Sequence, residues 1–205
     1  MTVIIFSARL RVMDPTPTRK QLSHDRIVDA AARAIRRHGY AGLGVADVMK
    51  DAGLTHGGFY AHFASRDALL VEAIERAGRG SSSFIGRRIE ALRETGASPF
   101  RALVESYLDD GLLKAVDAGC PVAALCSEMP RQAPEVRKAS SARVQSLVRY
   151  VGRCLSPDIP TEQAGVIAAT LIGSLQIARS IGTVAEGKAV LATTRATLLA
   201  QYDLS

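Results

Sequence analysis

Two short helical stretches joined by a glycine-containing turn restrict the fold more than any other segment. In "GVADVMKDAG", Val45, Val48 and Met49 share one side, and Gly53 ends the stretch. After the turn, a second stretch begins with Thr55 as its expected N-cap. Short helix, turn and short helix is the pattern of a helix-turn-helix, and it is equally the pattern of a helical hairpin within a bundle. The pattern alone leaves both interpretations open.

The second stretch, "GLTHGGFYAHF" at residues 53–63, has a composition that packing does not explain. Phe59 and Phe63 are four residues apart, so we expect them to bury together, while His56 and Tyr60 share an exposed face. Two adjacent glycines cost a helix about 0.5–1 kcal/mol each relative to alanine. That cost is reasonable where a backbone must approach another surface closely. We therefore expect this helix to be pressed against DNA.

The chemistry of the exposed side chains gives each an expected role at a DNA groove. Thr55 and His56 are short enough to read base edges, whereas Tyr60 and His62 donate to phosphate oxygens. Arg66 adds a charged contact at the start of the next helix. The expected DNA-binding residues are Thr55, His56, Gly57, Tyr60, His62 and Arg66.

Helices are also predicted on both sides of this motif. "SHDRIVDAAARAIRRHG" has an apolar stripe between Ser23, the expected N-cap, and Gly39, which follows the last helical residue. "SRDALLVEAIERA" begins a further helix that is capped by Ser65. Beyond about residue 80 the sequence again shows helical periodicity, interrupted by Gly78, Gly80 and Ser81–Ser83 and by a proline-rich stretch. The expected segments are 84–94, 99–117, 134–155, 161–181 and 187–202.

No useful strand-like alternation or internal repeat occurs, so the predicted fold class is all-α. We expect an N-terminal helix-turn-helix three-helix bundle and a larger C-terminal helical domain for ligand binding and dimerisation. The expected divisions are an N-terminal extension at 1–20, a DNA-binding domain at 21–68 and an effector-binding and dimerisation domain at 69–205. Met13 would make a more ordinary start, which leaves open whether residues 1–12 are translated.

Composition excludes several other classes of protein. The formal net charge of +6 weakly favours a polyanionic partner. Three cysteines without a CxxC spacing predict neither a disulfide framework nor a zinc ribbon, and we expect a cytoplasmic protein. No run of about 18 apolar residues predicts a membrane span. His56 and His62 are six residues apart and point to different sides, so we expect no metal. No phosphate loop, G-x-S-x-G or HExxH motif is present, so we expect neither a cofactor nor enzymatic activity.

The stretch "IVDAAARAIRRHGYAGLGVADVMKDAGLTHGGFYAHFASRDALL" closely resembles the DNA-binding region of the TetR family of bacterial transcriptional regulators. The resemblance covers about residues 25–75 and implies a homodimeric, all-helical repressor whose variable C-terminal domain binds a small molecule. The family's DNA-facing positions fall on the residues named above, with Arg66 in place of a phosphate-binding lysine. Gly44 replaces the usual Thr or Ser cap of the second helix, which removes a hydroxyl contact.

The two terminal helical segments, residues 161–202, are candidates for the dimer interface. "AGVIAATLIGSLQIARSIG" carries small residues that permit close helix approach, although an intrachain core helix has the same character. The resemblance favours the interface, because the last two helices of the family form one.

The interior of 84–155 is expected to hold an apolar or aromatic effector, because few charged residues lie among its candidate lining. Each candidate is also explained by simple core packing. The candidates are Leu103, Tyr107, Leu108, Leu112, Cys120, Val122, Leu125, Leu147 and Val151.

Cys120 gives rise to a second hypothesis. It follows Gly119 where one helix ends and another is expected to begin, and a helix N-terminus lowers the pKa of a thiol and makes it reactive. The alternative is a small buried residue. The main hypothesis is a repressor released from a palindromic operator by a small molecule, and the second is a thiol-based repressor that acts through Cys120.

Overall fold

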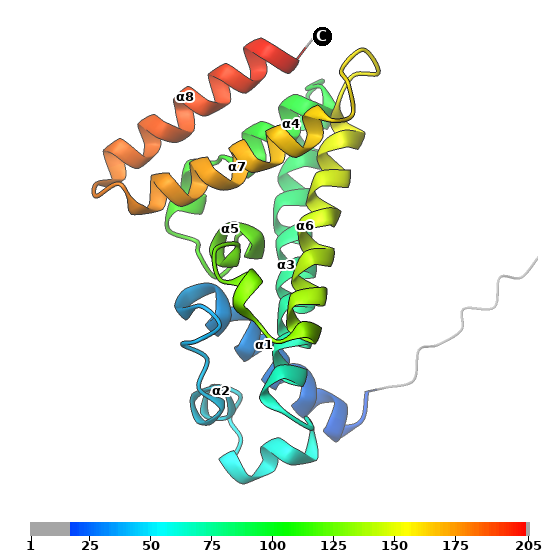
Figure 1. The fold of residues 1–205 in the computed structure, drawn as a ribbon, viewed down its shortest axis with the longest axis vertical. Coiled ribbons are helices and arrows are strands. Elements are labelled where there is room, and N and C mark those ends of the chain that lie inside the picture. Colours follow the sequence, from blue (N-terminus) through cyan, green and yellow to red (C-terminus); the bar gives the residue numbers. More distant parts are fainter. Residues whose placement is uncertain (1–16, 204–205) are drawn as a thin grey trace, which may run out of the picture.

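The computed structural model describes residues 17–203, and within this range the chain forms helices and no strand (Figure 1), which confirms the all-α class. The expected extension at residues 1–20 lies mostly outside the described range. The elements are α1 (Arg19–His38), α2 (Val45–Asp51), η1 (His56–Ala61), α3 (Arg66–Glu94), α4 (Pro99–Tyr107), η2 (Asp110–Leu113), α5 (Pro121–Leu125), η3 (Met129–Arg131), α6 (Pro134–Cys154), α7 (Gln163–Ser180) and α8 (Val184–Tyr202), where η marks a 3-10 helix.

Helix α1 begins five residues before the expected start, so the prediction of Ser23 as N-cap was wrong. Thr18 is the N-cap, because its hydroxyl accepts from the Gln21 N–H at 3.2 Å and the Gln21 side chain accepts from the Thr18 N–H at 2.7 Å. This reciprocal pair is a capping box. At the other end, Gly39 has φ 73° and ends the helix where the sequence predicted.

Helix α3 is 29 residues long and connects the two parts of the molecule. Ser65 caps it as predicted, with its hydroxyl accepting from the Ala68 N–H at 3.0 Å. The helix continues through Gly78, Gly80 and the serines, so the expected interruption there was wrong. Buried contacts on both sides of this stretch, such as Ile74 and Ile85, stabilise the helix despite its weak formers. The expected domain boundary at 68/69 falls in the first turn of α3, and the division stays a prediction.

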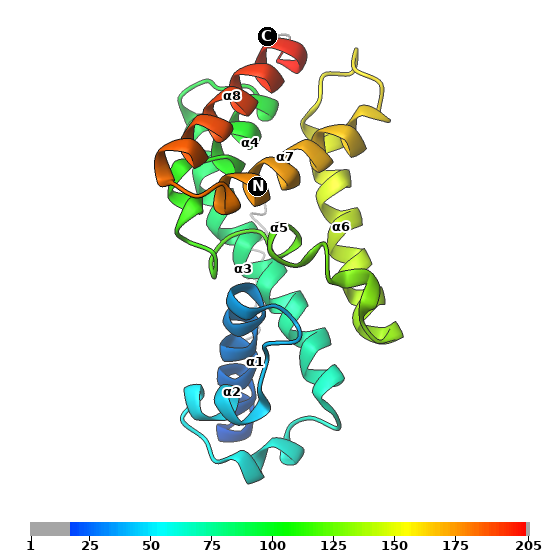
Figure 2. The same cartoon turned by 60° about the vertical axis from the view of Figure 1, so that its left-hand side comes forward.

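The C-terminal part surrounds the second half of α3 (Figures 1 and 2). Helices α3 and α6 run in the same direction side by side, and α7 and α8 cross above them. The expected helix at 99–117 is shorter, because Asp109 caps the separate turn η2 by accepting from the Gly111 N–H at 2.9 Å. Helix α8 begins three residues earlier than expected, where Thr183 and Glu186 form a second capping box.

One apolar core runs through both parts of the chain. Its largest fully buried side chains include Tyr40 and Phe59 near the DNA-binding bundle and Phe100 and Tyr107 in the C-terminal part. No helix within residues 17–203 is long and apolar enough to cross a membrane.

Candidate nucleic-acid interface and internal cavity

The turn between α2 and η1 fixes the direction of the second stretch. Gly53 has φ 69°, and its N–H donates to the Lys50 carbonyl, while the Leu54 N–H donates to the Met49 carbonyl, both at 2.9 Å. This pair of bonds is a Schellman motif, which requires a left-handed residue at the position of Gly53. The turn holds η1 at an angle to α2, as a helix-turn-helix does.

The stretch after the turn is helical, as predicted, but it is a single 3-10 segment of six residues rather than an α-helix. Its bonds span three residues, such as Gly58 N–H to the Thr55 carbonyl at 3.0 Å and His62 N–H to the Phe59 carbonyl at 2.9 Å. Two adjacent glycines and a short length favour the tighter coil. Thr55 precedes the segment as predicted, but its hydroxyl forms no cap bond and is exposed.

The inner face of η1 is aromatic. Phe59 and Phe63 are 2% and 3% exposed, and their rings stack with centroids 5.6 Å apart. Phe63 also stacks on His24, whose Nε2 lies 2.7 Å from Glu72 Oε2 on α3. These contacts confirm the expected burial of the two phenylalanines and make η1 a rigid element on the bundle.

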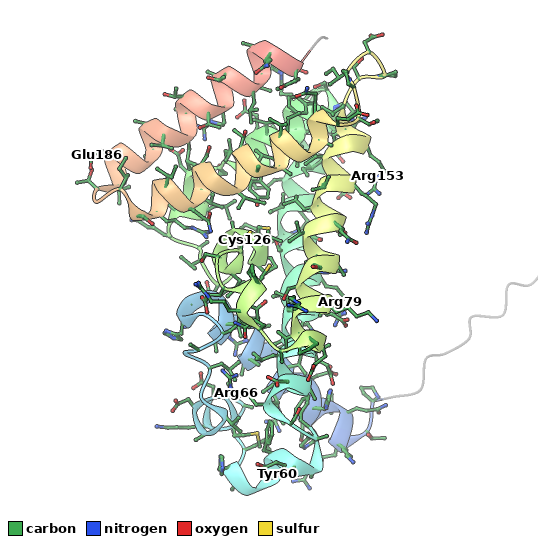
Figure 3. The ribbon with its side chains drawn as sticks, viewed as in Figure 1. Tyr60, Arg66, Arg79, Cys126, Arg153 and Glu186 are labelled. Atoms are coloured by element: carbon green, nitrogen blue, oxygen red, sulfur yellow. The ribbon has the colours of Figure 1, made fainter. Side chains whose placement is uncertain are left out.

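The outer face of η1 presents four of the six predicted residues. Thr55, His56, Gly57 and Tyr60 are all exposed, and Tyr60, 76% exposed, lies at the tip of the molecule (Figure 3). A Cβ built at Gly57 would meet no atom of residues 17–203 within 4 Å, and its φ is not positive. The chain's own packing therefore gives no reason for glycine at this position.

His62 and Arg66 are less free than the sequence suggested. His62 is partly buried, and burial first, then nearby His24, lowers its pKa, so its ring is neutral at pH 7. The guanidinium of Arg66 donates to the backbone carbonyls of Leu43 and Tyr40. Two of its nitrogens are thus used inside the protein, where they fix the start of α3 against the turn before α2. A phosphate contact by either residue stays a prediction.

Basic side chains around η1 are further candidates for phosphate contacts that the sequence reasoning missed. Lys20 at the start of α1 lies near His62, and Arg26 lies 3.7 Å from a Cβ built at Gly53 in the turn. Lys50 is exposed at the end of α2. A basic residue near either end of the motif is the signal that would have identified them.

A cavity of about 350 Å³ lies between α3, α4, α5 and α6. Five of the predicted effector residues line it, namely Leu103, Tyr107, Cys120, Val122 and Leu147. The structure places the other four, Leu108, Leu112, Leu125 and Val151, in the core outside this lining, each at most 1% exposed. Helical spacing identified buried positions here, but it did not distinguish a cavity wall from filled core.

The sequence reasoning also missed the polar part of the cavity wall. Arg143, Ser146, Tyr150 and Arg153 come from α6, and Gly78, Ser81, Ser82 and Gly86 come from α3. Because α3 was expected to break near residue 80, its serines and glycines were not assigned to a helix face that lines a cavity.

Cys120 is the residue before α5, 7% exposed, in the cavity wall. Helix α5 has only five residues, little more than one turn. The helix dipole that the thiol hypothesis relies on is therefore short.

A polar junction lies at the end of α1. It connects the bundle of α1, α2, η1 and the start of α3 (the DNA-binding bundle) to the rest of the chain, which contains the cavity (the cavity domain). Arg36 Nη1 donates to the Ala77 carbonyl at 3.3 Å, and Arg37 Nη2 lies 2.5 Å from Asp117 Oδ2. The Tyr40 N–H donates to Glu128 Oε2 at 3.0 Å. The Tyr40 hydroxyl and Ser140 Oγ are 2.7 Å apart, and both residues are buried.

The outer face of α7 and α8 is apolar and uncovered. Val166, Ile177 and Val184 are 50–56% exposed, and Ile181 is 41% exposed. Between them lie exposed small residues, including Gly165 and Ala169 on α7 and Ala185, Ala189, Ala192 and Ala196 on α8. Exposed apolar residues grouped on one face mark an interaction surface.

Comparisons with known proteins agree with this architecture. Residues 27–73 match the family described as bacterial regulatory proteins, tetR family. An uncharacterized HTH-type transcriptional regulator of Mycobacterium tuberculosis strain H37Rv is 30% identical over 166 residues, which cover 76% of this chain and 83% of that protein. The structure is similar to that of a TetR-family transcriptional regulator from Cytophaga hutchinsonii, with a TM-score of 0.75, 17% identity, and coverage of 93% of this chain and 99% of that chain. It is also similar to the reduced form of Escherichia coli NemR, with a TM-score of 0.65, 19% identity, and coverage of 84% and 94%. At these identities the solved structures show a shared fold.

Proposed function

This chain belongs to the TetR family of bacterial transcriptional regulators, and from that premise we propose that it is a homodimeric repressor released from a palindromic operator by a small molecule bound in the cavity. As a family member it is a DNA-binding regulator. We expect it to act in the cytoplasm, because bacterial DNA is there. The observation that carries the proposal is the exposed outer face of η1, which is supported by the buried Phe59 and Phe63. Among the described residues, the hydroxyls of Thr55 and Tyr60 have no hydrogen-bond partner.

The DNA-binding proposal is tested by two substitutions with different expected signatures. Tyr60→Phe removes one hydroxyl that we assign to a phosphate, so affinity falls for all sequences alike. His56→Ala removes a base contact, so discrimination at one base pair falls by about 1–3 kcal/mol. The operator is first selected from random DNA. Fluorescence anisotropy then measures the affinity of both protein variants for this operator and for a panel of its single-base variants. Identical behaviour of the two variants across the panel would contradict the division into phosphate and base contacts.

Dimerisation is proposed through the apolar face of α7 and α8. A single recognition element makes few contacts, and two of them must lie about 34–36 Å apart to occupy successive turns of one DNA groove. A charge placed on this face, Ala169→Glu, should give a monomer in analytical ultracentrifugation. Lys138→Glu introduces the same side chain at an exposed position of α6, away from α7 and α8, and should leave the dimer intact. A dimer that persists in Ala169→Glu would place the interface elsewhere.

Release is proposed to act through the junction between α1 and the cavity domain. Ala77, which accepts from Arg36, precedes the cavity residue Gly78, and Cys120 follows soon after Asp117, the partner of Arg37. A ligand that shifts these walls moves the end of α1, and with it the spacing of the two DNA-binding bundles. Linkage requires the ligand and the operator to weaken each other's binding by the same factor. A ligand with equal affinity for free and DNA-bound protein would exclude this scheme for that ligand.

A thiol-based mechanism remains the second candidate because Cys120 lines the cavity that the proposed effector occupies. Its test is Cys120→Ala in an assay of oxidant-induced release from DNA. Release that survives the substitution would eliminate Cys120 as the sensor.

A further inference from the structure

The polar and apolar residues of the cavity lie at different levels along α3. Gly78 and Ser81 are at the end near the DNA-binding bundle. Ile85 and Ile89 lie about 10 and 16 Å beyond Gly78 along the helix axis, at about 1.5 Å per residue. Since α6 runs parallel to α3, Arg143 is opposite Gly78 and Leu147 is one turn further on. Ile85, Ile89 and Leu147 therefore give the cavity an apolar stretch beyond its polar end. Arg153 of α6 lies further along the same wall, with its guanidinium 5.4 Å from the centroid of the Tyr150 ring.

Arg143 supplies a positive charge at the polar end. A Cβ built at Gly78 would lie 2.7 Å from Arg143 Cδ and 3.0 Å from Nη1, so the absence of a side chain at Gly78 makes room for the arginine to lie across α3. Arg143 Nε is buried without a hydrogen-bond partner, and the structure gives Arg143 no ion pair within residues 17–203. None of the described residues that line the cavity is acidic. A buried donor on a guanidinium is costly unless an acceptor pairs with it.

A second unpaired donor faces the same cavity. Tyr107 is 2% exposed, and its hydroxyl has no hydrogen-bond partner among the described residues. Burial, and then nearby Cys120, raises the pKa of Tyr107 well above 10, so the hydroxyl keeps its proton and donates. Ser81, which is 5% exposed, adds a further hydroxyl to the polar end. The wall thus offers the guanidinium groups of Arg143 and Arg153 and neutral donors but, among the described residues, no carboxylate, which is the complement of an anion.

We propose that the effector is a small organic carboxylate with an apolar body, whose carboxylate pairs with Arg143 while its apolar part lies against Ile85, Ile89 and Leu147. This inference rests on the proposed function only in treating the cavity as the effector site. The volume of about 350 Å³ is near the lower limit of ordinary ligand pockets, which restricts the ligand to a small molecule. The charge distribution of the wall changes the sequence-based expectation of an apolar or aromatic effector to an amphipathic acid.

The carboxylate end of the ligand also lies beside the junction. The Arg143 side chain lies against the backbone of Gly78. Gly78 directly follows Ala77, whose carbonyl accepts a hydrogen bond from Arg36 of α1. An anion that draws Arg143 toward itself therefore acts one residue away from the contact between the cavity domain and the DNA-binding bundle. The position of the charge explains how a small ligand is sensed by α1.

Calorimetric titration of the full chain with matched probes tests the proposal. The probes are phenylacetate, 4-phenylbutyrate and octanoate, each compared with its primary amide and with the amine of the same length. Carboxylates should bind at least about tenfold more tightly than amides or amines, because only the carboxylate offers a charged acceptor to the guanidinium. Arg143→Met should remove this preference. Arg149→Met is the matched control, since Arg149 is exposed on the same helix and outside the cavity wall.

Gly78→Ala gives an independent variant that keeps the charge and displaces it, and it should also weaken carboxylate binding. Circular dichroism and thermal melting establish that each variant is folded. Any one of three results overturns the proposal. They are that no carboxylate of the panel binds, that amides or amines bind as tightly as acids, or that acids bind as tightly to Arg143→Met as to the original chain. The proposed function fails separately, if the protein binds no operator or if no compound that binds in the cavity releases it from DNA.

Discussion

At the scale of single residues, Gly57 is a position where the fold does not require glycine. The chain leaves open space beside it and holds it at an ordinary φ, so alanine fits the fold. The sequence predicted that the glycines at 57–58 serve a close approach to DNA, and the structure shows that the packing of the described residues does not require glycine at position 57. At Gly58, a Cβ would lie 3.6 Å from Met49 Cε, an ordinary packing contact inside the motif.

Gly57→Ala should therefore raise stability and lower DNA affinity at once. Alanine restricts the unfolded chain and favours helical conformations, which adds about 0.5–1 kcal/mol to the free energy of unfolding. The added methyl group keeps the backbone away from DNA and weakens operator binding. Urea unfolding and fluorescence anisotropy measure the two effects, and Gly80→Ala on exposed α3 is the control that should change stability alone. Unchanged DNA affinity in Gly57→Ala would remove Gly57 from the interface.

His62 makes stability depend on pH in a known direction. Burial and His24 lower its folded-state pKa below the ordinary 6.5, so the unfolded chain binds the proton more readily. The contribution of the neutral ring is complete above pH 6.5 and is lost as pH falls through 6.5 toward the lower folded pKa. Between pH 7.5 and 5.5, the unfolding free energy should thus fall less in His62→Gln than in the original chain. Equal slopes, measured by urea unfolding at each pH, would contradict this assignment.

At the scale of elements, the sequence predicted most helices, but it predicted only some of their first and last residues and missed the continuity of α3. Gly39 and Ser65 were identified because a positive φ and a side-chain cap require particular residues. The start of α1 was missed because two hydroxyl residues, Thr18 and Ser23, precede the apolar stripe, and only Thr18 has Gln21 in the capping-box position. The continuity of α3 depends on contacts with distant helices, which local propensity does not contain.

The cap of α1 gives a paired test at this scale. Thr18→Ala should lower the free energy of unfolding by about 1 kcal/mol, because the Gln21 N–H loses its acceptor. Ser23→Ala should change it by a few tenths at most, because the Ser23 hydroxyl accepts only from exposed Arg26 at 3.3 Å. Chemical denaturation measures both variants. A larger loss in Ser23→Ala than in Thr18→Ala would restore the shorter helix.

At the scale of the whole molecule, the contacts of the junction connect the DNA-binding bundle to the cavity domain. The sequence predicted the halves, since each follows its own periodicity, but it gave no sign that Tyr40 contacts residues 88 and 100 positions away. The cavity was predicted in part for the same reason, since its wall combines four helices. Contacts of this range depend on packing angles, which no short motif specifies.

The hydrogen bond between the buried hydroxyls of Tyr40 and Ser140 connects the two parts of the molecule, and its removal tests how much it stabilises them. Tyr40→Phe leaves the Ser140 hydroxyl without its partner inside the core, and Ser140→Ala does the same to the Tyr40 hydroxyl, so each single variant should lose about 1–3 kcal/mol of stability. The double variant removes both polar groups and should lose clearly less than the sum of the two. Urea unfolding of the four proteins measures the coupling energy. A coupling energy would show that this hydrogen bond stabilises the contact between the end of α1 and α6. Additive losses would mean that this bond does not join the two halves.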